Sequence, residues 1–590
     1  ASDVLRRSLT ERLARLGEAL RAATEHADVR ASTHGPETSL ADRERLTAVE
    51  EAWRAVRTHQ LARRADDVRV PRAEAALRLT RWLATSSPVR EHAGLAAYVD
   101  RHRDNDAWVD RAVNDAWAGV DEPGLARGLR TVLAAVRLRR DAHDIAFAQS
   151  LAGYEGGGDS PIPLEDLLAH TVFPLAKQQP VLLVVADGMS VAAATGIVDD
   201  LVTPAKGWLD CVPEGKRVRQ SALALLPTLT TVSRASLLSG EPTVGEQAAE
   251  KDGFERSRKA HGMSGRLFHK HPLESKEAGF ALAGDVAAAV DDTEALSLVA
   301  CVLNTIDDAL DRSDPGGTEW TAATVKHLGP LLERARAAGR VVVLTSDHGH
   351  VIERRDGHTL SVGATSSNRS RPADGGPPAG DGEIRVRGQR VLLHNGDAIL
   401  AVDERLRYGP LKSGYHGGGS PAEVVVPVCV LAPGEAPPSW RLAPPQAPPW
   451  WHGAVSSAEP PRVEQPRGRG KAADTGPTLF DEDAELRHPD LASAVLRSPQ
   501  YEAQRKRAPR TPVSDEQIAA LLRALLSAPA CRLASESAAA ALGVAMVQLA
   551  GALPAVQRLL NVEQYSVISR DPDGDTIVLD ETLLCEQFGV

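Results

Sequence analysis

Cysteine and aromatic residues are both scarce in this chain. Among its 590 residues, the five cysteines are Cys211, Cys301, Cys429, Cys531 and Cys585. An odd number of cysteines without a close pair argues against a disulfide framework and against a Cys-rich zinc module. Because Phe, Trp and Tyr make up only 4% of the chain, we expect cores built mainly from Leu, Val and Ala.

The chain also lacks long apolar runs and an excess of basic residues. No apolar run approaches the about 20 residues of a membrane span, and the N-terminus does not resemble a signal peptide, so we expect a cytoplasmic protein without membrane contact. The sequence begins Ala1-Ser2 without a methionine, as a fragment or a processed chain would. Acidic residues outnumber basic ones by 79 to 68, which excludes a globally basic nucleic-acid coat but not a local basic patch.

Four regions differ in their residue patterns. Leucines at three- and four-residue steps, from Leu5 and again from Leu125, predict amphipathic helices. Apolar, β-branched runs separated by helical patterns then predict a layered α/β domain, and a Pro-rich stretch follows it. The expected regions are a helical domain over 1–154 with tryptophans in its core, an α/β domain over 155–433, a linker over 434–512 and a winged-helix-like domain over 513–590.

The last region combines three helix signals with a hairpin signal. Ser514-Asp-Glu-Gln517 fits a capping box, and a second helix is expected over 535–542. Pro554 is expected to kink or divide the third helix, and Asp573-Gly574 predicts a hairpin turn. Three helices and a hairpin are typical of a winged helix. Since Arg558 is the only basic residue of the third helix, contact with protein is favoured over reading of DNA bases.

Carboxylates and imidazoles gather at the ends of the predicted strands. We expect strands over 180–186, 298–303, 341–344 and 424–430. In open α/β sheets the carboxyl ends of the strands form the ligand crevice, and such side chains there suit zinc or manganese. Each residue alone has a simpler explanation as part of a turn or of a helix N-terminus. The candidate ligands are Asp187, Asp307, Asp311, Asp347, His348 and His416.

A hydroxyl-rich segment, 226–240, accompanies these acids. By itself it fits a helix N-terminus capped by Ser and Thr. A threonine hydroxyl on a metal ion is also a competent nucleophile, because the cation lowers the cost of forming the alkoxide. The chain contains no P-loop, HExxH motif or nucleophile elbow. Cys211-Val-Pro-Glu-Gly215 lacks the arginine that sulfatase chemistry needs.

Six separated pieces resemble, in their order, the alkaline phosphatase superfamily. They are Asp187, Pro227-Thr-Leu-Thr230, Ser239-Gly240, Asp307, Asp347-His348-Gly349 and His416. The Pro-Thr-x-Thr form is similar to the nucleotide pyrophosphatase/phosphodiesterase branch. Three pieces resemble the PglZ proteins of phage-defence (BREX) systems, namely Thr230-Thr-Val-Ser-Arg234, Asn304-Thr-Ile-Asp307 and Tyr415-His-Gly-Gly418. The segment from Val556 to Val562, with Asp580 to Phe588, resembles the end of PglZ from the second BREX subtype.

The resemblance implies an alkaline-phosphatase-like α/β core and a metal-dependent phosphatase or phosphodiesterase. Thr230 would be the nucleophile, and Ser233 or Arg234 would contact a phosphoryl oxygen, with a structural salt bridge equally expected for Arg234. One metal would be held by Asp187, Thr230, Asp347 and His348, and a second by Asp307 and His416. The expected ion is Zn²⁺. Asp311 stands where pyrophosphatase relatives have histidine, and this carboxylate makes the second site more oxygen-rich, which favours Mn²⁺ or weakens binding of the second metal.

The resemblance also implies partners, namely other defence-system proteins such as a DNA methyltransferase and a large ATPase. The phosphoester substrate stays open among a phosphomonoester, a nucleotide, a nucleic-acid strand and a phosphoprotein. An expected surface insertion at 361–392 would give specificity through Arg385, Arg387 and Arg390. The alternative to an enzyme is a scaffold of the defence complex whose metal site is vestigial or completed by a partner.

Overall fold

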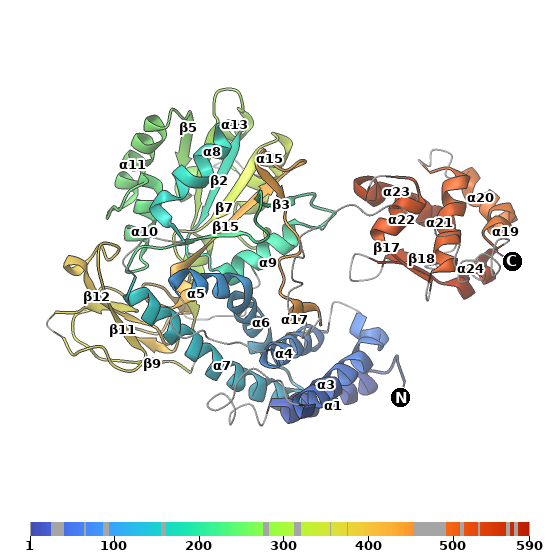
Figure 1. The fold of residues 1–590 in the computed structure, drawn as a ribbon, viewed down its shortest axis with the longest axis horizontal. Coiled ribbons are helices and arrows are strands. Elements are labelled where there is room, and N and C mark those ends of the chain that lie inside the picture. Colours follow the sequence, from blue (N-terminus) through green and yellow to red (C-terminus); the bar gives the residue numbers. More distant parts are fainter. Residues whose placement is uncertain are drawn as a thin grey trace, which may run out of the picture. The chain divides into compact units, whose positions relative to one another are not determined.

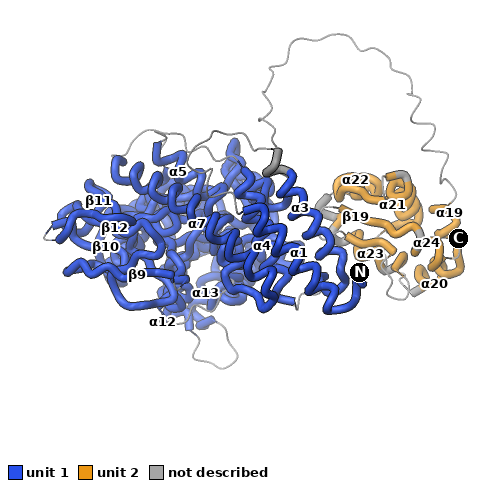
Figure 2. Tube along the Cα trace, turned by 90° about the horizontal axis from the view of Figure 1, so that it is seen from below, with its two compact units in different colours: residues 1–459 blue, residues 460–590 orange. Residues whose placement is uncertain are grey.

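In the computed structural model the chain forms two units, and their positions relative to one another are not determined (Figure 1). The units are Ala1–Glu459 and Pro460–Val590 (Figure 2). In the described part of the chain, no helix combines the length and the apolar character that crossing a membrane requires. The structure describes residues 2–24, 40–63, 67–85, 94–154, 161–274, 282–311, 320–354, 356–374, 376–453, 491–507, 513–528, 531–544, 546–561, 567–570 and 576–588.

The N-terminal region is helical, as the leucine spacing predicts. Its helices are α1 (Arg6–Thr24), α3 (Leu40–Arg57), α4 (Arg69–Leu83), α5 (Leu95–Arg101), α6 (Ala107–Trp117) and α7 (Pro123–Ala152), with a 3-10 turn η1 (Gln60–Arg63) and a π-helical turn η2 (His102–Asp106). Trp53, Trp82 and Trp108 lie in the core of this region. The prediction of buried tryptophans is wrong for Trp117, which is 43% exposed. The Trp117 ring instead lies against the guanidinium of Arg354.

Helices α1 and α7 pack backbone to backbone through glycines. A Cβ on Gly17 would overlap the carbonyl of Gly124, and one on Gly128 would lie 2.5 Å from the carbonyl oxygen of Gly17. We expect Gly17→Ala to lower the free energy of unfolding by about 1–3 kcal/mol, because this overlap outweighs the better helix propensity of alanine. Gly284→Ala is the control, since its Cβ would meet open space at the start of a helix. Equal thermal stability of the two variants would contradict the close approach.

A mixed nine-stranded sheet forms the centre of the α/β region. The sequence-predicted strands correspond to β2 (Val181–Ala186), β6 (Leu298–Leu303), β7 (Val341–Thr345) and β15 (Val425–Ala432). The order is β1-β4-β15-β7-β2-β6-β5, with β3 beside β15 and β16 beside β3. Strands β5, β6, β2 and β7 are parallel, whereas β15 runs antiparallel to β7. The other strands of this sheet are β1 (Ile162–Pro163), β3 (Leu209–Pro213), β4 (Gln220–Leu223), β5 (Gly265–Phe268) and β16 (Trp440–Leu442).

Helices cover both faces of the sheet, because the side chains of β2 alternate between two hydrophobic clusters. Leu182 and Val184 pack in one cluster with α9 (Val191–Leu201), α13 (Gly284–Asp291) and α15 (Leu328–Ala337). Leu183 and Val185 pack in the other with α8 (Phe173–Ala176), α10 (Thr230–Ser239) and α11 (Gln247–Ala260). The remaining elements here are η3 (Leu164–Asp166), η4 (Leu168–Val172), α12 (Lys270–Leu273), α14 (Thr305–Leu310) and α16 (Pro421–Val424).

The expected surface insertion is partly buried. It contributes β10 (Ser370–Pro372) to a small sheet of order β10-β12-β11. Arg369 is fully buried and its guanidinium lies 2.9 Å from the carboxylate of Glu423, so an Arg–Glu pair anchors this segment to the core. The short strands of this region are β8 (Val351–Ile352), β9 (His358–Thr359), β11 (Glu383–Arg387), β12 (Asp397–Ala401), β13 (Leu406–Arg407) and β14 (Gly414–Tyr415), with a turn η5 (His394–Gly396).

The start of the predicted linker is folded into the first unit. Strand β16 extends the central sheet, and α17 (Pro449–His452) places Trp450 and Trp451 in the core of the helical region. The indole N–H of Trp450 donates to Asn105 Oδ1 at 2.7 Å. This Pro-rich segment is therefore packed against the first unit and is not a linker. The predicted linker sequence also contains a small basic cluster, Arg467-Gly-Arg-Gly-Lys471, which lies outside the described residues.

The second unit has the helix and strand order of a winged helix. Its core helices are α21 (Asp515–Ser527), α22 (Ser535–Ala541) and α23 (Met546–Leu560), and its strands β17 (Arg532–Ala534), β18 (Ile568–Arg570) and β19 (Thr576–Leu579) pair antiparallel as β17-β19-β18. The capping box of Ser514 and Gln517 is present. Pro554 does not divide α23, and Asp573-Gly574 lies outside the described residues. Helices α19 (Leu491–Arg497), α20 (Pro499–Arg507) and α24 (Glu581–Phe588) complete the unit, so the end of the predicted linker is folded too.

Candidate metal centre and nucleophile

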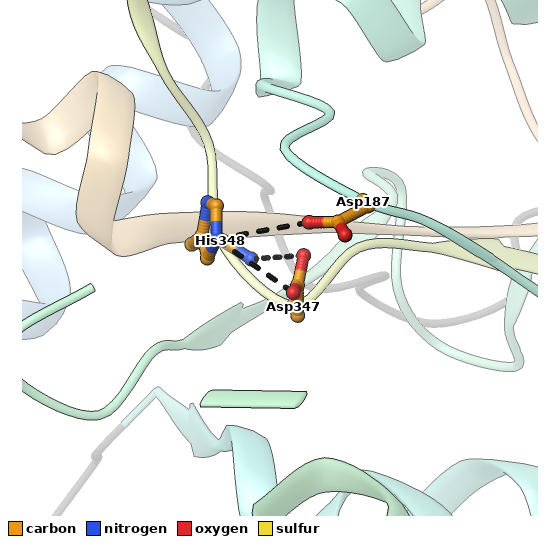
Figure 3. A group of neighbouring side chains, drawn as sticks. All are labelled: Asp187, Asp347 and His348. Atoms are coloured by element: carbon orange, nitrogen blue, oxygen red, sulfur yellow. Dashed lines mark hydrogen bonds and ion pairs between the residues drawn. The ribbon is translucent and has the colours of Figure 1, made fainter. Parts of the chain in front are cut away.

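Three buried side chains meet where β2 and β7 end. Asp187 follows β2, and Asp347 and His348 follow β7. Since the two strands are parallel neighbours in the sheet, residues 160 positions apart in the chain lie side by side. Figure 3 shows the three side chains turned toward one another, and one ligand atom from each lies within 4.8 Å of the others. None of the three is more than 1% exposed.

The local backbone aims Asp347 and His348 into this cluster. Asp347 Oδ1 accepts hydrogen bonds from the backbone N–H groups of Gly188 (3.2 Å) and His348 (3.0 Å). Asp347 Oδ2 is buried and has no hydrogen-bond partner. The Nδ1–H of His348 donates to the carbonyl of Gly349 at 3.0 Å, because a carbonyl can only accept. The lone pair of His348 is therefore on Nε2, facing the cluster.

Thr230 brings a hydroxyl to the same cluster. It is the first residue of α10, and its Oγ1 lies 3.2 Å from His348 Nε2 and 3.5 Å from Asp187 Oδ1. The N-terminus of a helix carries partial positive charge and favours anions such as a phosphoryl group. Thr228 points elsewhere, since its hydroxyl donates to the carbonyl of Gly418. The sequence-predicted nucleophile is thus the hydroxyl that the fold brings to the acids.

Arg234 and Ser233 are placed differently from the expected phosphate contacts. The guanidinium of Arg234 donates to Asp187 Oδ2 and, at 2.9 Å, to Glu250 Oε1. Glu250 Oε2 lies 2.6 Å from His269 Nε2, so a buried chain of polar groups extends behind Asp187. The hydroxyl of Ser233 donates to the carbonyl of Leu225 and is fully buried. Of the two expectations for Arg234, the geometry shows the salt bridge.

Burial and mutual repulsion perturb the acids of the cluster. Burial, together with the negative charge of Asp347, raises the pKa of Asp187 well above its usual range. Interactions with His348 and Arg234 outweigh burial at Asp347 and lower the pKa of that carboxyl. Burial lowers the pKa of His348, which keeps the imidazole neutral and able to bind a metal.

We expect the hydrogen bonds of Arg234 to set the metal affinity of Asp187. Lysine keeps the charge but cannot bridge Asp187 and Glu250 as the planar guanidinium does, so Arg234→Lys should weaken divalent-cation binding by about 10- to 100-fold. Competition against a chromophoric chelator measures this change. Arg256→Lys, which alters an exposed ion pair with Glu241, is the matched control and should leave the affinity unchanged. An Arg234→Lys affinity within threefold of the wild type would contradict this role.

The second predicted set of ligands is only partly assembled. His416 Nε2 lies 3.4 Å from Asp307 Oδ1, and the ring of His416 stacks on that of His348 with centroids 4.2 Å apart. Asp311 instead lies 2.5 Å from the ammonium of Lys412, and its side chain is 64% exposed. The structure thus brings Asp307 and His416 to the centre, and places Asp311 in an ion pair.

Several residues that support the centre were not assigned by the sequence. Asn304 donates to Asp187 Oδ2 at 2.6 Å, and the ring of His350 lies 2.6 Å from the carbonyl of Gly188. Burial lowers the pKa of His350 to about 4. Asn304 begins one of the motifs quoted above and His350 directly follows another, so the motifs could have pointed to both. Glu250 and His269 carry no local signal, because only the packing of α11 brings them near the site.

The expected basic surface of the insertion is neutralised. Arg385 and Arg387 both bind Asp397, at 2.6 and 2.9 Å. Arg390 binds Glu165 at 2.7 Å. The prediction that these arginines select the substrate therefore has no support from their contacts.

Asp187, Asp347, His348 and Thr230 fit a divalent cation. The unpartnered oxygen of Asp347 and the lone pair of His348 Nε2 converge from fixed directions, and hydrogen bonds on their outer atoms hold both in place. A mixed carboxylate and imidazole set suits Zn²⁺ or Mn²⁺. The residues of the second predicted metal site fit a cation less well, because Asp311 is paired with Lys412.

Comparison with solved structures shows weak likeness to phosphoester and phosphonate hydrolases. The murine ectonucleotide pyrophosphatase/phosphodiesterase 5 is 12% identical over 44% of this chain and 89% of its own, with a TM-score of 0.31. The human protein of the same name is 11% identical over 43% and 88%, with a TM-score of 0.30. Phosphonoacetate hydrolase from Sinorhizobium meliloti 1021, in complex with phosphonoformate, is 12% identical over 48% and 96%, with a TM-score of 0.31. No curated protein matches the chain.

Two family models match the chain, one in each unit. The BREX system PglZ alkaline phosphatase-like domain matches residues 167–431, which hold most of the central sheet and every ligand candidate. The BREX system PglZ C-terminal domain matches residues 486–589, which hold the winged-helix-like unit. Together the two matches cover more than half of the chain and agree in order with its two units, so the protein belongs to the PglZ family.

Proposed function

We propose that this protein is a divalent-metal-dependent phosphoric ester hydrolase, a phosphodiesterase or phosphatase, of a bacterial BREX phage-defence system. The observation that carries the proposal is the convergence of Asp187, Asp347 and His348 on the hydroxyl of Thr230. Carboxylates, an imidazole and a hydroxyl at a helix N-terminus are the groups that phosphoryl transfer needs for metal binding and nucleophilic attack.

In the proposed reaction the start of α10 receives the phosphoryl group and Thr230 attacks it. As the Oγ1–P bond forms, the hydroxyl gives its proton to solvent. The bond from phosphorus to the leaving oxygen breaks, and that oxygen takes a proton from solvent. Water then attacks the phosphothreonine, the P–Oγ1 bond breaks and Thr230 regains its proton. A divalent cation on this set, Zn²⁺ with Mn²⁺ as the alternative, would stabilise the threonine alkoxide and the charge of the phosphoryl oxygens.

The remaining residues of the centre position the reacting groups. Arg234 and Asn304 both donate to Asp187 Oδ2, which leaves Oδ1 as the atom nearer Thr230. The backbone contacts of Asp347 and His348 hold the other two ligand atoms in their directions. Because these bonds exist before substrate binds, little reorganisation is needed during the reaction.

Partners are proposed from family membership. Other BREX proteins, among them a DNA methyltransferase and a large ATPase, are the expected partners. The C-terminal unit is a candidate for protein contact, since Arg558 is the only basic residue in the sequence of α23. Assignment to the second BREX subtype stays a prediction.

The test is hydrolysis of a chromogenic phosphodiester and of its monoester by the full chain, with Zn²⁺ or Mn²⁺ and with chelator. We expect turnover that depends on the cation, and the preference between the two esters then gives the substrate class. One observation favours the alternative, a non-catalytic or partner-activated scaffold: the second ligand set is incomplete at Asp311. Absence of turnover despite a bound cation would support that scaffold.

A further inference from the structure

A pocket adjoins the proposed centre on the side of His416. It encloses about 280 Å³ and is lined by the consecutive polar residues 365–368 together with Asp311, Lys412 and His416. The ring of His416 stacks on the metal-ligand candidate His348, so the pocket begins next to the centre. A substrate group that leaves the phosphoryl site on this side meets hydroxyls, an amide and the ion pair of Lys412 with Asp311.

The ligands that would hold a second cation beside this pocket converge only in part, since Asp307 and His416 meet but Asp311 does not join them. In the part of the chain that the structure describes, one group of three metal-ligating side chains converges, namely Asp187, Asp347 and His348. These three are at most 1% exposed, whereas the side chains of Asp307, His416 and Asp311 are 24%, 25% and 64% exposed. The side chains of the second set are therefore more exposed to solvent than those of the first.

Lys412 takes up the carboxylate that would complete the second set. Its ammonium lies 2.5 Å from Asp311 Oδ1, so a cation bound to that carboxylate would lie beside a like charge. A lysine ammonium is also a compact charge with three donors on a flexible stem, which suits contact with a phosphoryl oxygen. Lys412 thus occupies an oxygen that a second metal ion would need. Unlike the paired arginines of the insertion, it lines the pocket beside the centre, and its ammonium has donors beyond the one bound to Asp311.

We propose that the centre holds one divalent cation, on Asp187, Asp347 and His348, and that Lys412 supplies the second positive charge by contacting the phosphoester substrate. This inference rests on the proposed function, and it names the residue that replaces the second metal ion. The polar lining at 365–368 then faces the part of the substrate beyond the phosphorus.

The first test is the metal content of the untagged full chain. The protein is stripped with chelator, reloaded with Zn²⁺ or Mn²⁺, freed of excess ion by gel filtration and analysed by mass spectrometry. One ion per chain is expected for the wild type, and also for Asp311→Asn, because Asp311 is not a ligand. Two ions in the wild type, falling to one in Asp311→Asn, would overturn the inference and leave the proposed function standing. No bound ion at all would overturn the proposed function itself.

The second test addresses Lys412 by steady-state kinetics. Loss of one charged contact to the phosphoryl group should lower kcat/KM by about 10- to 100-fold in Lys412→Met, at unchanged metal content. Lys412→Arg keeps the charge and should lose less. Lys206→Met removes an exposed lysine that pairs with Asp200 away from the pocket, and is the matched control. A Lys412→Met variant as active as this control would overturn the role of Lys412.

Discussion

Thr230→Ala is expected to abolish phosphoester hydrolysis, with a fall in kcat of about 10³- to 10⁶-fold. The alanine removes the hydroxyl that lies 3.2 Å from His348 Nε2 and 3.5 Å from Asp187 Oδ1. Asp187, Asp347 and His348 stay in place, so the variant should still bind a cation. Initial rates with the chromogenic diester and monoester, at saturating Zn²⁺ or Mn²⁺, measure the effect.

Two variants control for damage to α10. Thr230→Ser keeps a hydroxyl and should retain measurable turnover, although without the methyl group its rotamer is less restricted. Thr231→Ala changes the neighbouring, exposed threonine and should leave kcat within about threefold of the wild type. If Thr230→Ala hydrolyses as fast as Thr231→Ala, another group is the nucleophile.

Asp347→Asn is expected to remove the stabilisation that a divalent cation confers. A ligand that binds only the folded state at 1,000 times its Kd stabilises it by about 4 kcal/mol, which is several degrees in Tm for a domain of this size. The amide keeps the oxygen that accepts from Gly188 and His348 but replaces the unpartnered, metal-facing oxygen with an NH₂ group. We therefore expect little or no thermal shift on adding Zn²⁺ or Mn²⁺.

In the absence of metal, Asp347→Asn should not lower the thermal stability of the protein and should raise it if it has an effect. Asp347 and Asp187 are buried side by side, and the charge of Asp347 helps raise the pKa of Asp187. Asparagine removes that repulsion and can donate a hydrogen bond, so the metal-free variant should melt at or above the Tm of the metal-free wild type. Asp308→Asn, an exposed acid paired with Lys270, is the control and should keep the full metal-dependent shift. An undiminished shift in Asp347→Asn would show that this carboxylate is not a ligand.

Local patterns predicted the elements of the fold closely. The apolar runs at 180–186 and 298–303 became β2 and β6, because strands buried on both faces need apolar residues throughout. Composition alone assigned the Pro-rich segment after the α/β domain to a linker, whereas its packing against the rest of the unit makes its start part of the fold. The Pro-rich start of the expected linker holds Trp450 and Trp451, whose burial on the helical core outweighs the linker composition around them.

In the candidate site, too, some residues could be predicted from the sequence and others could not. Its ligand candidates stand directly after predicted strands, so Asp187, Asp347 and His348 could be named from their sequence positions, and the parallel pairing of β2 with β7 brings them together. The network of buried side chains behind these ligands could not be predicted from the sequence, since Arg234 reaches Glu250 only through the packing of α10 on α11.

By itself, the sequence determined the strands, the helices, the types of the candidate ligands and the hydroxyl segment, because each depends on residues within a few positions of one another. Only the tertiary structure decided where Asp311 points. The carboxylate stands one helical turn after Asp307, as a ligand pattern requires, yet it binds Lys412 from a loop 101 positions away. Electrostatic pairing between such distant residues depends on the distance between their charged atoms in the folded chain, which the spacing along the sequence does not contain.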